Sequence, residues 1–276
     1  MEPPRRVGDL RRNIAVLARE VGTTDRRLIA LTGNMALSQM LPESIVKGGT
    51  GLKLRLGERL TRETPDLDTA FRGDLDRFRE ELATRLSVGW GGFTGTATMG
   101  PKRTPDSIPS AYVMQPFRVT LRYHGKVFKA IDLEVGYDEL GATADPPELH
   151  MSEEVVTLFR ALGLPTPSPV RVQPLHYQVA QKLHACTAPG SDRAHDLVDL
   201  QLTVPLADGA LVARAARRTF RYRNEHVWPP VARVGPDWDT LYRVAAEGLN
   251  VLPTVTDAAA WLNAYIERLT LVDPID

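Results

Sequence analysis

The stretch that decides this fold reads Lys47-Gly48-Gly49-Thr50 and continues, sixteen residues after Thr50, with Asp66-Leu67-Asp68. A strand-like run over residues 43–46 leads into the glycines, and the Asp-x-Asp segment is predicted to be extended, within a strand over roughly residues 62–71. Successive side chains of an extended segment alternate between two faces. The two aspartates are therefore expected to project from the same face.

The two halves of this stretch suit different ligands: the aspartates suit a cation, and the glycine turn suits an anion. Two carboxylates on one face repel each other unless a cation lies between them, and oxygen ligands of this kind suit Mg²⁺. Gly48 and Gly49 allow backbone N–H groups to approach an anion, and Thr50 adds a hydroxyl donor. A Gly-Gly pair alone is usually only a turn, and an Asp-x-Asp alone is usually a solvated strand edge or loop. Together and in this order, they predict phosphoryl or nucleotidyl transfer.

Composition limits where the chain acts. With 276 residues it can hold one large domain or two small ones. Its formal net charge of +0 excludes a global field toward nucleic acid or membrane, so any such attraction requires a local patch. The single cysteine, Cys186, excludes an internal disulfide, and no run approaches the length of a membrane span. We therefore expect a soluble cytoplasmic protein with no membrane partner.

Periodicity predicts the remaining elements of the first half. The expected elements are helices within residues 8–40, broken at 21–25, a helix at 74–86, a loop at 89–110 with a strand at its start, and a hairpin of strands 111–123 and 126–136. The second hairpin strand carries Asp132 with apolar neighbours on the other face. A single strand aspartate is usually exposed and idle. If this strand pairs beside the Asp-x-Asp strand, Asp132 is the natural third metal ligand or general base.

The second half is predicted to be largely helical. The expected helices cover residues 174–188, 191–200 with Asp192 as its cap, 208–221, 238–251 and 257–269. Arg214, Arg217, Arg218 and Arg221 stand at i, i+3, i+4 and i+7, which places them on one helical face. Such a stripe is usually a solvated face. In a chain of zero net charge, it also suits the phosphate backbone of an RNA.

Several motifs together resemble a known family. They are Gly48-Gly49-Thr50, Arg62-x-Thr64-x-Asp66-Leu67-Asp68, Ile131-Asp132-Leu133, Gln181-Lys182-Leu183-His184-Ala185 and Arg193-x-x-Asp196-x-x-Asp199-Leu200. In this order they are similar to the AbiEii/AbiGii (MenT-like) nucleotidyltransferase toxins, of the DNA polymerase β-like nucleotidyltransferase superfamily. That branch often has Lys-Asp where this chain has His195-Asp196.

The resemblance implies a bilobed α+β enzyme. It would have a mixed-sheet nucleotidyltransferase domain with N-terminal helices over residues 1–150, and a mainly helical domain over 151–276 that completes the cleft. The family transfers a nucleotide from an NTP, in several members onto the 3′ end of tRNA, which blocks translation, and a cognate antitoxin is normally encoded nearby. By this resemblance Thr64 joins Gly48, Gly49 and Thr50 as a nucleotide-binding residue.

Lys182 and Asp196 are the site residues expected from the second half. Lys182 lies on a mostly apolar helix, which favours a cleft position, and its ammonium could contact the triphosphate. Asp196 could orient Lys182, contact the nucleotide or pair with Arg193 across one turn, and Asp199 is expected to be structural.

In the expected chemistry, Asp66 and Asp68 hold Mg²⁺ on the α- and β-phosphates, and Asp132 binds a second metal or accepts a proton. Two alternatives to tRNA modification stay open. One is nucleotide transfer to a small molecule, such as an aminoglycoside, or to a protein hydroxyl. The other is a non-catalytic binding module of the same fold. Presence of all three carboxylates and of Lys182 disfavours the latter.

Overall fold

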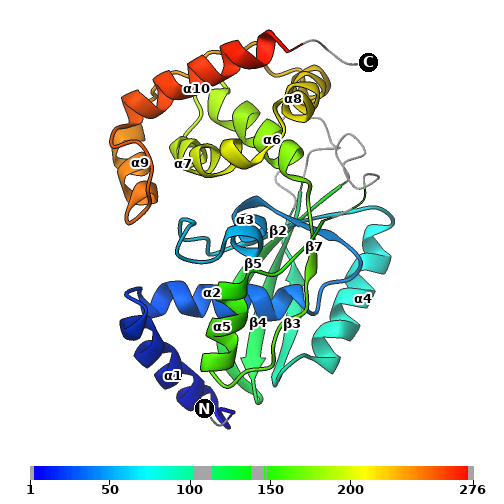
Figure 1. The fold of residues 1–276 in the computed structure, drawn as a ribbon. Coiled ribbons are helices and arrows are strands. Elements are labelled where there is room, and N and C mark those ends of the chain that lie inside the picture. Colours follow the sequence, from blue (N-terminus) through cyan, green and yellow to red (C-terminus); the bar gives the residue numbers. More distant parts are fainter. Residues whose placement is uncertain (1–2, 102–113, 138–145, 147, 273–276) are drawn as a thin grey trace. The chain divides into compact units, whose positions relative to one another are not determined.

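The computed structural model describes residues 3–101, 114–137, 146 and 148–272, and it divides into two compact units (Figure 1). Unit 1 consists of Met1–Glu58 and Glu63–Val172, and unit 2 of Arg59–Arg62 and Gln173–Asp276. The sequence placed the division after residue 150. The units divide after Val172 because the last strand of unit 1, β7, ends there and pairs with β1.

Unit 1 is built on one mixed sheet, as predicted. Its strands are β1 (Ile45–Lys47), β2 (Leu67–Phe71), β3 (Phe93–Met99), β4 (Gln115–Tyr123), β5 (Lys126–Tyr137), β6 (Glu148–His150) and β7 (Val170–Val172). They lie side by side in the order β3-β4-β5-β2-β1-β7-β6. The pairs β2/β5 and β1/β7 are parallel and the others antiparallel. The hairpin strand β5 therefore does lie beside the Asp-x-Asp strand β2.

The helices of unit 1 are α1 (Val7–Glu20), α2 (Asp25–Ser38), α3 (Gly48–Leu56), α4 (Leu75–Val88) and α5 (Glu153–Ala161). The predicted break between the first two is confirmed, and the Thr24 side chain caps α2 by accepting a hydrogen bond from Arg27 N. The strand expected at the start of residues 89–110 is β3. Residues 102–113 lie outside the described part of the chain.

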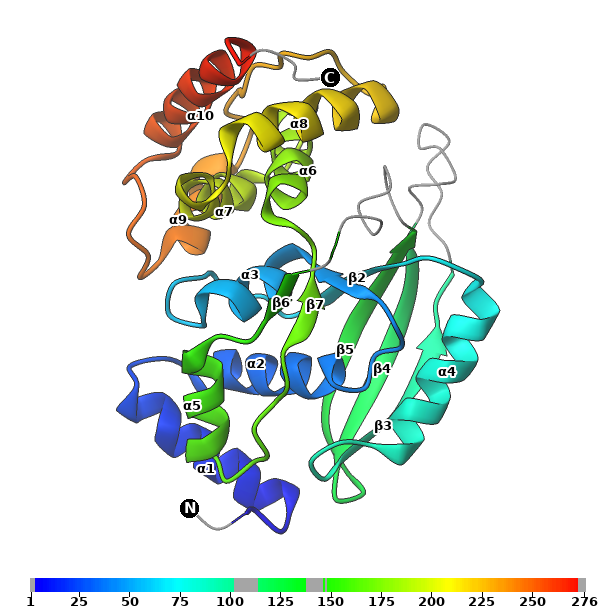
Figure 2. The ribbon, with the colours of Figure 1, turned by 45° about the vertical axis from the view of Figure 1, so that its right-hand side comes forward.

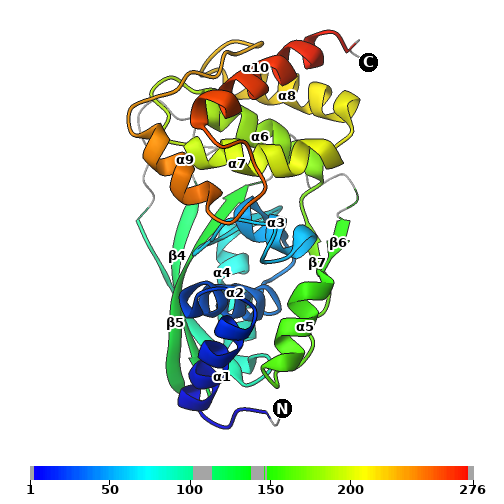
Figure 3. The same ribbon diagram turned by 60° about the vertical axis from the view of Figure 1, so that its left-hand side comes forward.

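One face of the sheet packs on helices. In β5 every second residue from Ile131 to Val135 is buried, whereas Asp132 is exposed, as its alternation predicted. Helix α2 approaches the sheet at Gly33, where a β-carbon would come 3.2 Å from Ile131 Cδ1. Figure 3 shows α2 and α4 on the same side of β4 and β5. Asp132 therefore lies on the face of the sheet that these helices do not cover.

Unit 2 is helical in its described residues (Figure 2). Its elements are α6 (Leu175–Thr187), α7 (Ala194–Thr203), a short 3-10 helix (Val204–Leu206), α8 (Gly209–Arg223), α9 (Trp238–Ala246) and α10 (Val255–Thr270). The predicted cap at Asp192 is wrong, because α7 begins after Arg193, which makes no side-chain cap bond. Within the described residues, no helix is both long and apolar enough to cross a membrane.

Candidate active site

The glycine turn and the Asp-x-Asp segment meet in unit 1. Strand β1 ends at Lys47, and Gly48 opens helix α3 with a φ of 61°. A β-carbon on Gly48 would lie 2.0 Å from Asp68 Oδ2, and one on Gly49 would lie 2.3 Å from Thr64 Oγ1. Only glycines leave room for this carboxylate and this hydroxyl. The first N–H groups of a helix have no partner within it, so this turn can receive an anion.

The side chain of Thr50 holds the Asp-x-Asp segment through a hydrogen bond to its backbone. Its buried hydroxyl donates to Asp66 O at 2.9 Å and lies 3.2 Å from Asn34 Nδ2, which also donates to Asp66 O at 2.8 Å. The expected contact of this hydroxyl with an anion would therefore require a change of partner. Thr64 differs, since its buried Oγ1 has no hydrogen-bond partner within the described part of the chain. An unpartnered hydroxyl beside the glycine turn suits a phosphate oxygen or a metal-bound water.

The register of the sheet adds a carboxylate that sequence reasoning missed. Parallel pairing sets Asp68 opposite Glu134, two residues after Asp132 on β5. Directly opposite residues share a face, so Asp68, Asp132 and Glu134 belong to the uncovered face. Asp66 precedes β2, which begins at Leu67, so the strand is shorter than predicted and its alternation does not place the Asp66 side chain. Alternation in β5 could have indicated that Glu134 and Asp132 share a face. Which of them stands opposite Asp68 depends on the register, and the sequence does not reveal it.

Asp132 forms an ion pair across the hairpin. Arg118 on β4 stands opposite it and donates from Nη1 to Asp132 Oδ1 at 2.5 Å, with both side chains more than half exposed. Among the described residues, no three carboxylates have ligand atoms that all lie within 4.8 Å of one another. The donor set fits Mg²⁺ in its chemistry, but the carboxylates would have to rotate toward one another for three of them to share one ion.

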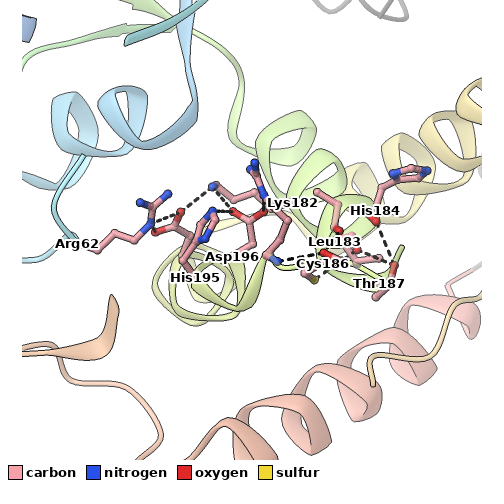
Figure 4. Close-up of polar contacts among 12 residues, drawn as sticks. Arg62, Lys182, Leu183, His184, Cys186, Thr187, His195 and Asp196 are labelled. Carbon is pink, nitrogen blue, oxygen red and sulfur yellow. Dashed lines mark hydrogen bonds and ion pairs between the residues drawn. The ribbon is translucent and has the colours of Figure 1, made fainter. Parts of the chain in front are cut away.

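Unit 2 contributes a buried ion-pair cluster around Lys182 (Figure 4). Lys182 Nζ lies 2.8 Å from Asp196 Oδ1 and 2.6 Å from Asp199 Oδ2. Arg193 Nε also donates to Asp196, and Arg62 Nε donates to Asp199. The expected pairing of Asp196 with Lys182 and Arg193 is present in this structure. Arg62 and Asp199 are parts of the cluster for which sequence reasoning predicted no site role.

Both partners of the central pair are charged. Burial alone would lower the pKa of Lys182, but Asp196 and Asp199 outweigh burial and raise it. Burial would likewise raise the pKa of Asp196, and Lys182 and Arg193 instead hold it far below its usual range. Two of the three N–H donors of Lys182 are used in these pairs, which leaves one for a ligand.

His195 cannot replace a lysine as a cation at neutral pH. Burial lowers the pKa of His195 to about 4, and the nearby Asp196 carboxylate only partly offsets that effect. Its Nε2 lies 3.8 Å from Asp196 Oδ1. The ring is therefore neutral at pH 7, so the departure from the Lys-Asp pattern removes a positive charge beside Asp196.

The arginine stripe on α8 is only partly available to a ligand. Arg214, Arg218 and Arg221 are exposed. Arg217 is half-buried, and its Nη2 donates to Leu269 O at 3.2 Å and Val272 O at 2.9 Å. Arg217 thus holds carbonyls at the end of α10, where orphan acceptors otherwise need partners. Helical spacing predicted the shared face but not this capping contact.

A second group of ligand-type side chains lies on α6 and directly after α8. His184, Glu225 and His226 have ligand atoms within 4.8 Å of one another. Arg223 Nη1 lies 3.3 Å from His184 Nδ1, and because a guanidinium only donates, the proton of the neutral ring resides on Nε2. A cation would have to displace Arg223 from His184 Nδ1 to bind there, so the observed arrangement does not favour a metal.

Comparison with known proteins agrees with the geometry of the two units. Residues 29–264 match the family described as "Nucleotidyl transferase AbiEii toxin, Type IV TA system". The chain belongs to the AbiEii family. It is thus a nucleotidyltransferase toxin of a type IV toxin–antitoxin system, which implies a cognate antitoxin.

A solved structure shows the same fold as this AbiEii chain. MenT4, a nucleotidyltransferase toxin from Mycobacterium tuberculosis H37Rv, is similar with a TM-score of 0.61 and 20% sequence identity, over 94% of this chain and 90% of MenT4. No curated protein matches the sequence. The α+β architecture with a mixed seven-stranded sheet and a helical C-terminal part, expected from the motifs, is confirmed.

Proposed function

We propose that this AbiEii protein transfers a nucleotide from an NTP, with Mg²⁺, onto the 3′ end of tRNA and so blocks translation. The observation that carries the proposal is the approach of the Asp68 carboxylate to Gly48 at the start of α3. This approach would bring a metal ligand beside backbone N–H groups that suit a phosphate. A nucleotidyltransferase needs both within one rigid element, because positioning and electrostatics supply most of the rate enhancement.

Residues of unit 1 divide this work. Asp66 and Asp68 would hold Mg²⁺, which when bound neutralises the phosphates and orients them for in-line attack. Gly48, Gly49 and Thr50 would bind phosphate through the first turn of α3, and Thr64 would add its unpartnered hydroxyl. Asp132 stays the proposed third ligand or proton acceptor, and Glu134, opposite Asp68, is a second candidate for that role.

Residues of unit 2 would serve the leaving group. We propose that the remaining donor of Lys182 contacts the triphosphate and stabilises charge on the departing pyrophosphate. Asp196 would keep that ammonium charged and oriented. The exposed arginines of α8 would contact RNA phosphates, with Arg217 supporting the helix that carries them.

A different acceptor is the second candidate function. A small molecule or a protein hydroxyl would use the same carboxylates, so the site does not separate the classes. Exposure of Arg214, Arg218 and Arg221 on one helix favours RNA. A non-catalytic module is disfavoured, because the glycine turn, the Asp-x-Asp pair and Lys182 all persist.

The test is to incubate the purified chain with Mg²⁺ and each labelled NTP, with and without total tRNA. Label appearing in tRNA, and only with one or some NTPs, is the expected result. Label in the protein itself, or none with any NTP, would reject tRNA as the acceptor. Removing Mg²⁺ with EDTA should abolish the transfer.

A further inference from the structure

Lys47 shares a row of the sheet with two carboxylates. The antiparallel pair β1/β2 sets Lys47 opposite Asp68, and the parallel pair β2/β5 sets Asp68 opposite Glu134. Directly opposite residues place their side chains on one face. Half-buried Lys47 therefore belongs to the uncovered face that carries the carboxylates.

The Lys47 side chain extends from β1 toward β5. A β-carbon on Gly136 would lie 3.2 Å from Lys47 Nζ, and Met114 Sδ lies 3.8 Å from the same nitrogen. Gly136 stands two residues after Glu134 on β5, so both face the same way. The missing side chain at position 136 leaves the space that the ammonium fills.

Within the described part of the chain, this ammonium has no carboxylate within ion-pair distance, and its one hydrogen-bonding contact is with the weak acceptor sulfur of Met114. The buried lysines differ, since Lys53 pairs with Glu58 at 2.8 Å and Lys182 pairs with two aspartates. A cation partly removed from water and lacking a counter-ion gains free energy when an anion binds beside it.

We propose that Lys47 is a phosphate-binding residue of unit 1 that contacts the polyphosphate of the nucleotide donor. This inference rests on the proposed function. Lys47 directly precedes the Gly48-Gly49 turn, so the ammonium, the helix N-terminus and the Asp68 carboxylate are positioned together within one unit. Its three N–H donors are not used by any oxygen of the described residues, and a compact ammonium suits phosphate as a point charge.

Inorganic tripolyphosphate tests this role without a base, a sugar or an acceptor. Its affinity for the full chain in the presence of Mg²⁺ is measured by calorimetry for the wild type and for Lys47→Met, which keeps the apolar stem and removes the charge. Lys126→Met, at an exposed lysine at the start of β5, is the matched control. Removing one charge-assisted hydrogen bond should weaken binding about tenfold or more, whereas the control should bind as the wild type does.

Gly136→Ala provides a second variant that retains Lys47. Its methyl group would occupy the position 3.2 Å from Nζ, while its other nearest atoms, Met114 Cγ at 3.6 Å and Thr69 O at 3.7 Å, are at ordinary contact distances. The ammonium must therefore give way by a few tenths of an ångström, and tripolyphosphate binding should weaken in the same direction as for Lys47→Met but by less. A loss by a folded Gly136→Ala protein larger than that of Lys47→Met would contradict the assignment of the binding charge to Lys47.

Two results would overturn the proposal. One is equal affinities of the wild type and Lys47→Met, whether or not the melting temperature of the variant is lower. The other is no binding by the wild type. The labelled-NTP assay is read separately. A wild type that binds tripolyphosphate through Lys47 but transfers no nucleotide would support this site and reject the proposed function, so the two failures are distinguishable.

Discussion

The carboxylate of Asp68 lies against the α-carbon of Gly48. A β-carbon at position 48 would be 2.0 Å from Asp68 Oδ2, and the φ of 61° at Gly48 is one that other residues rarely adopt. The glycine is thus required twice, for its backbone conformation and for its missing side chain. The glycine turn and the Asp-x-Asp segment, which are far apart in sequence, are therefore in direct contact in the structure.

Gly48→Ala should therefore damage the site more than the fold. The methyl group must displace Asp68, and a shift of about 1 Å in a reacting geometry can cost about a hundredfold in rate. Left-handed strain adds about 1–2 kcal/mol of destabilisation. Gly8→Ala is the control, because no atom lies within 4 Å of a β-carbon there. Nucleotide transfer and urea unfolding measure the two effects, and a fully active Gly48→Ala protein would contradict the close approach.

Lys182→Met should lower both stability and turnover. The substitution leaves two buried carboxylates, Asp196 and Asp199, without their shared ammonium, and removing one partner of a buried ion pair costs about 3–5 kcal/mol. Lys182→Arg should restore transfer poorly, since a planar guanidinium does not fit a site made for an ammonium. Chemical denaturation and transfer at low temperature separate these effects. Full stability and full turnover of Lys182→Met would contradict both assigned roles.

The protein should lose stability as pH falls below about 6.5. Burial, with help from Arg223, lowers the pKa of His184 from 6.5 to about 3, so the folded state keeps this ring neutral while the unfolded state takes up a proton. Between pH 6.5 and 5, the loss from this one buried ring is about 2 kcal/mol. Denaturant unfolding at pH 7 and 5, for wild type and His184→Gln, measures it. The variant should show a smaller pH dependence, and an equal dependence would remove His184 as the cause.

The arginines of α8 should separate into two classes. Arg217→Ala should reduce stability, because its guanidinium holds two carbonyls at the end of α10. Arg214→Ala/Arg221→Ala should leave stability unchanged, because both side chains are exposed. It should instead lower the dependence of tRNA affinity on salt by about one unit of slope for each phosphate that the variant no longer binds. If the salt dependence of tRNA affinity has the same slope for this double variant and the wild type, the arginines of α8 do not bind RNA and form only a solvated face.

Motifs and local periodicity predicted much of this structure. Most of the helices, the hairpin, the mixed sheet and the pairing of β5 beside β2 follow from alternation, helical spacing and the family resemblance. The elements α5, β6 and β7 were not predicted. The register of the strands could not be predicted, because a shift of two residues keeps the same side chains buried. The position of Glu134 opposite Asp68 was missed for this reason. The contacts of Arg217 and Asp199 also depend on residues distant in sequence, which local patterns do not reveal.

The central claim is that the carboxylate beside Gly48 takes part in nucleotide transfer, and Asp68→Asn tests it most directly. This change keeps the size of the side chain, removes its charge and should leave the fold intact, since less like charge remains on the face it shares with Glu134. With the NTP and acceptor found for the wild type, and Mg²⁺ present, initial rates of transfer are measured for both proteins. The account predicts a loss of about a thousandfold or more with an unchanged unfolding midpoint. A folded Asp68→Asn protein that transfers nucleotide at nearly the wild-type rate would contradict it.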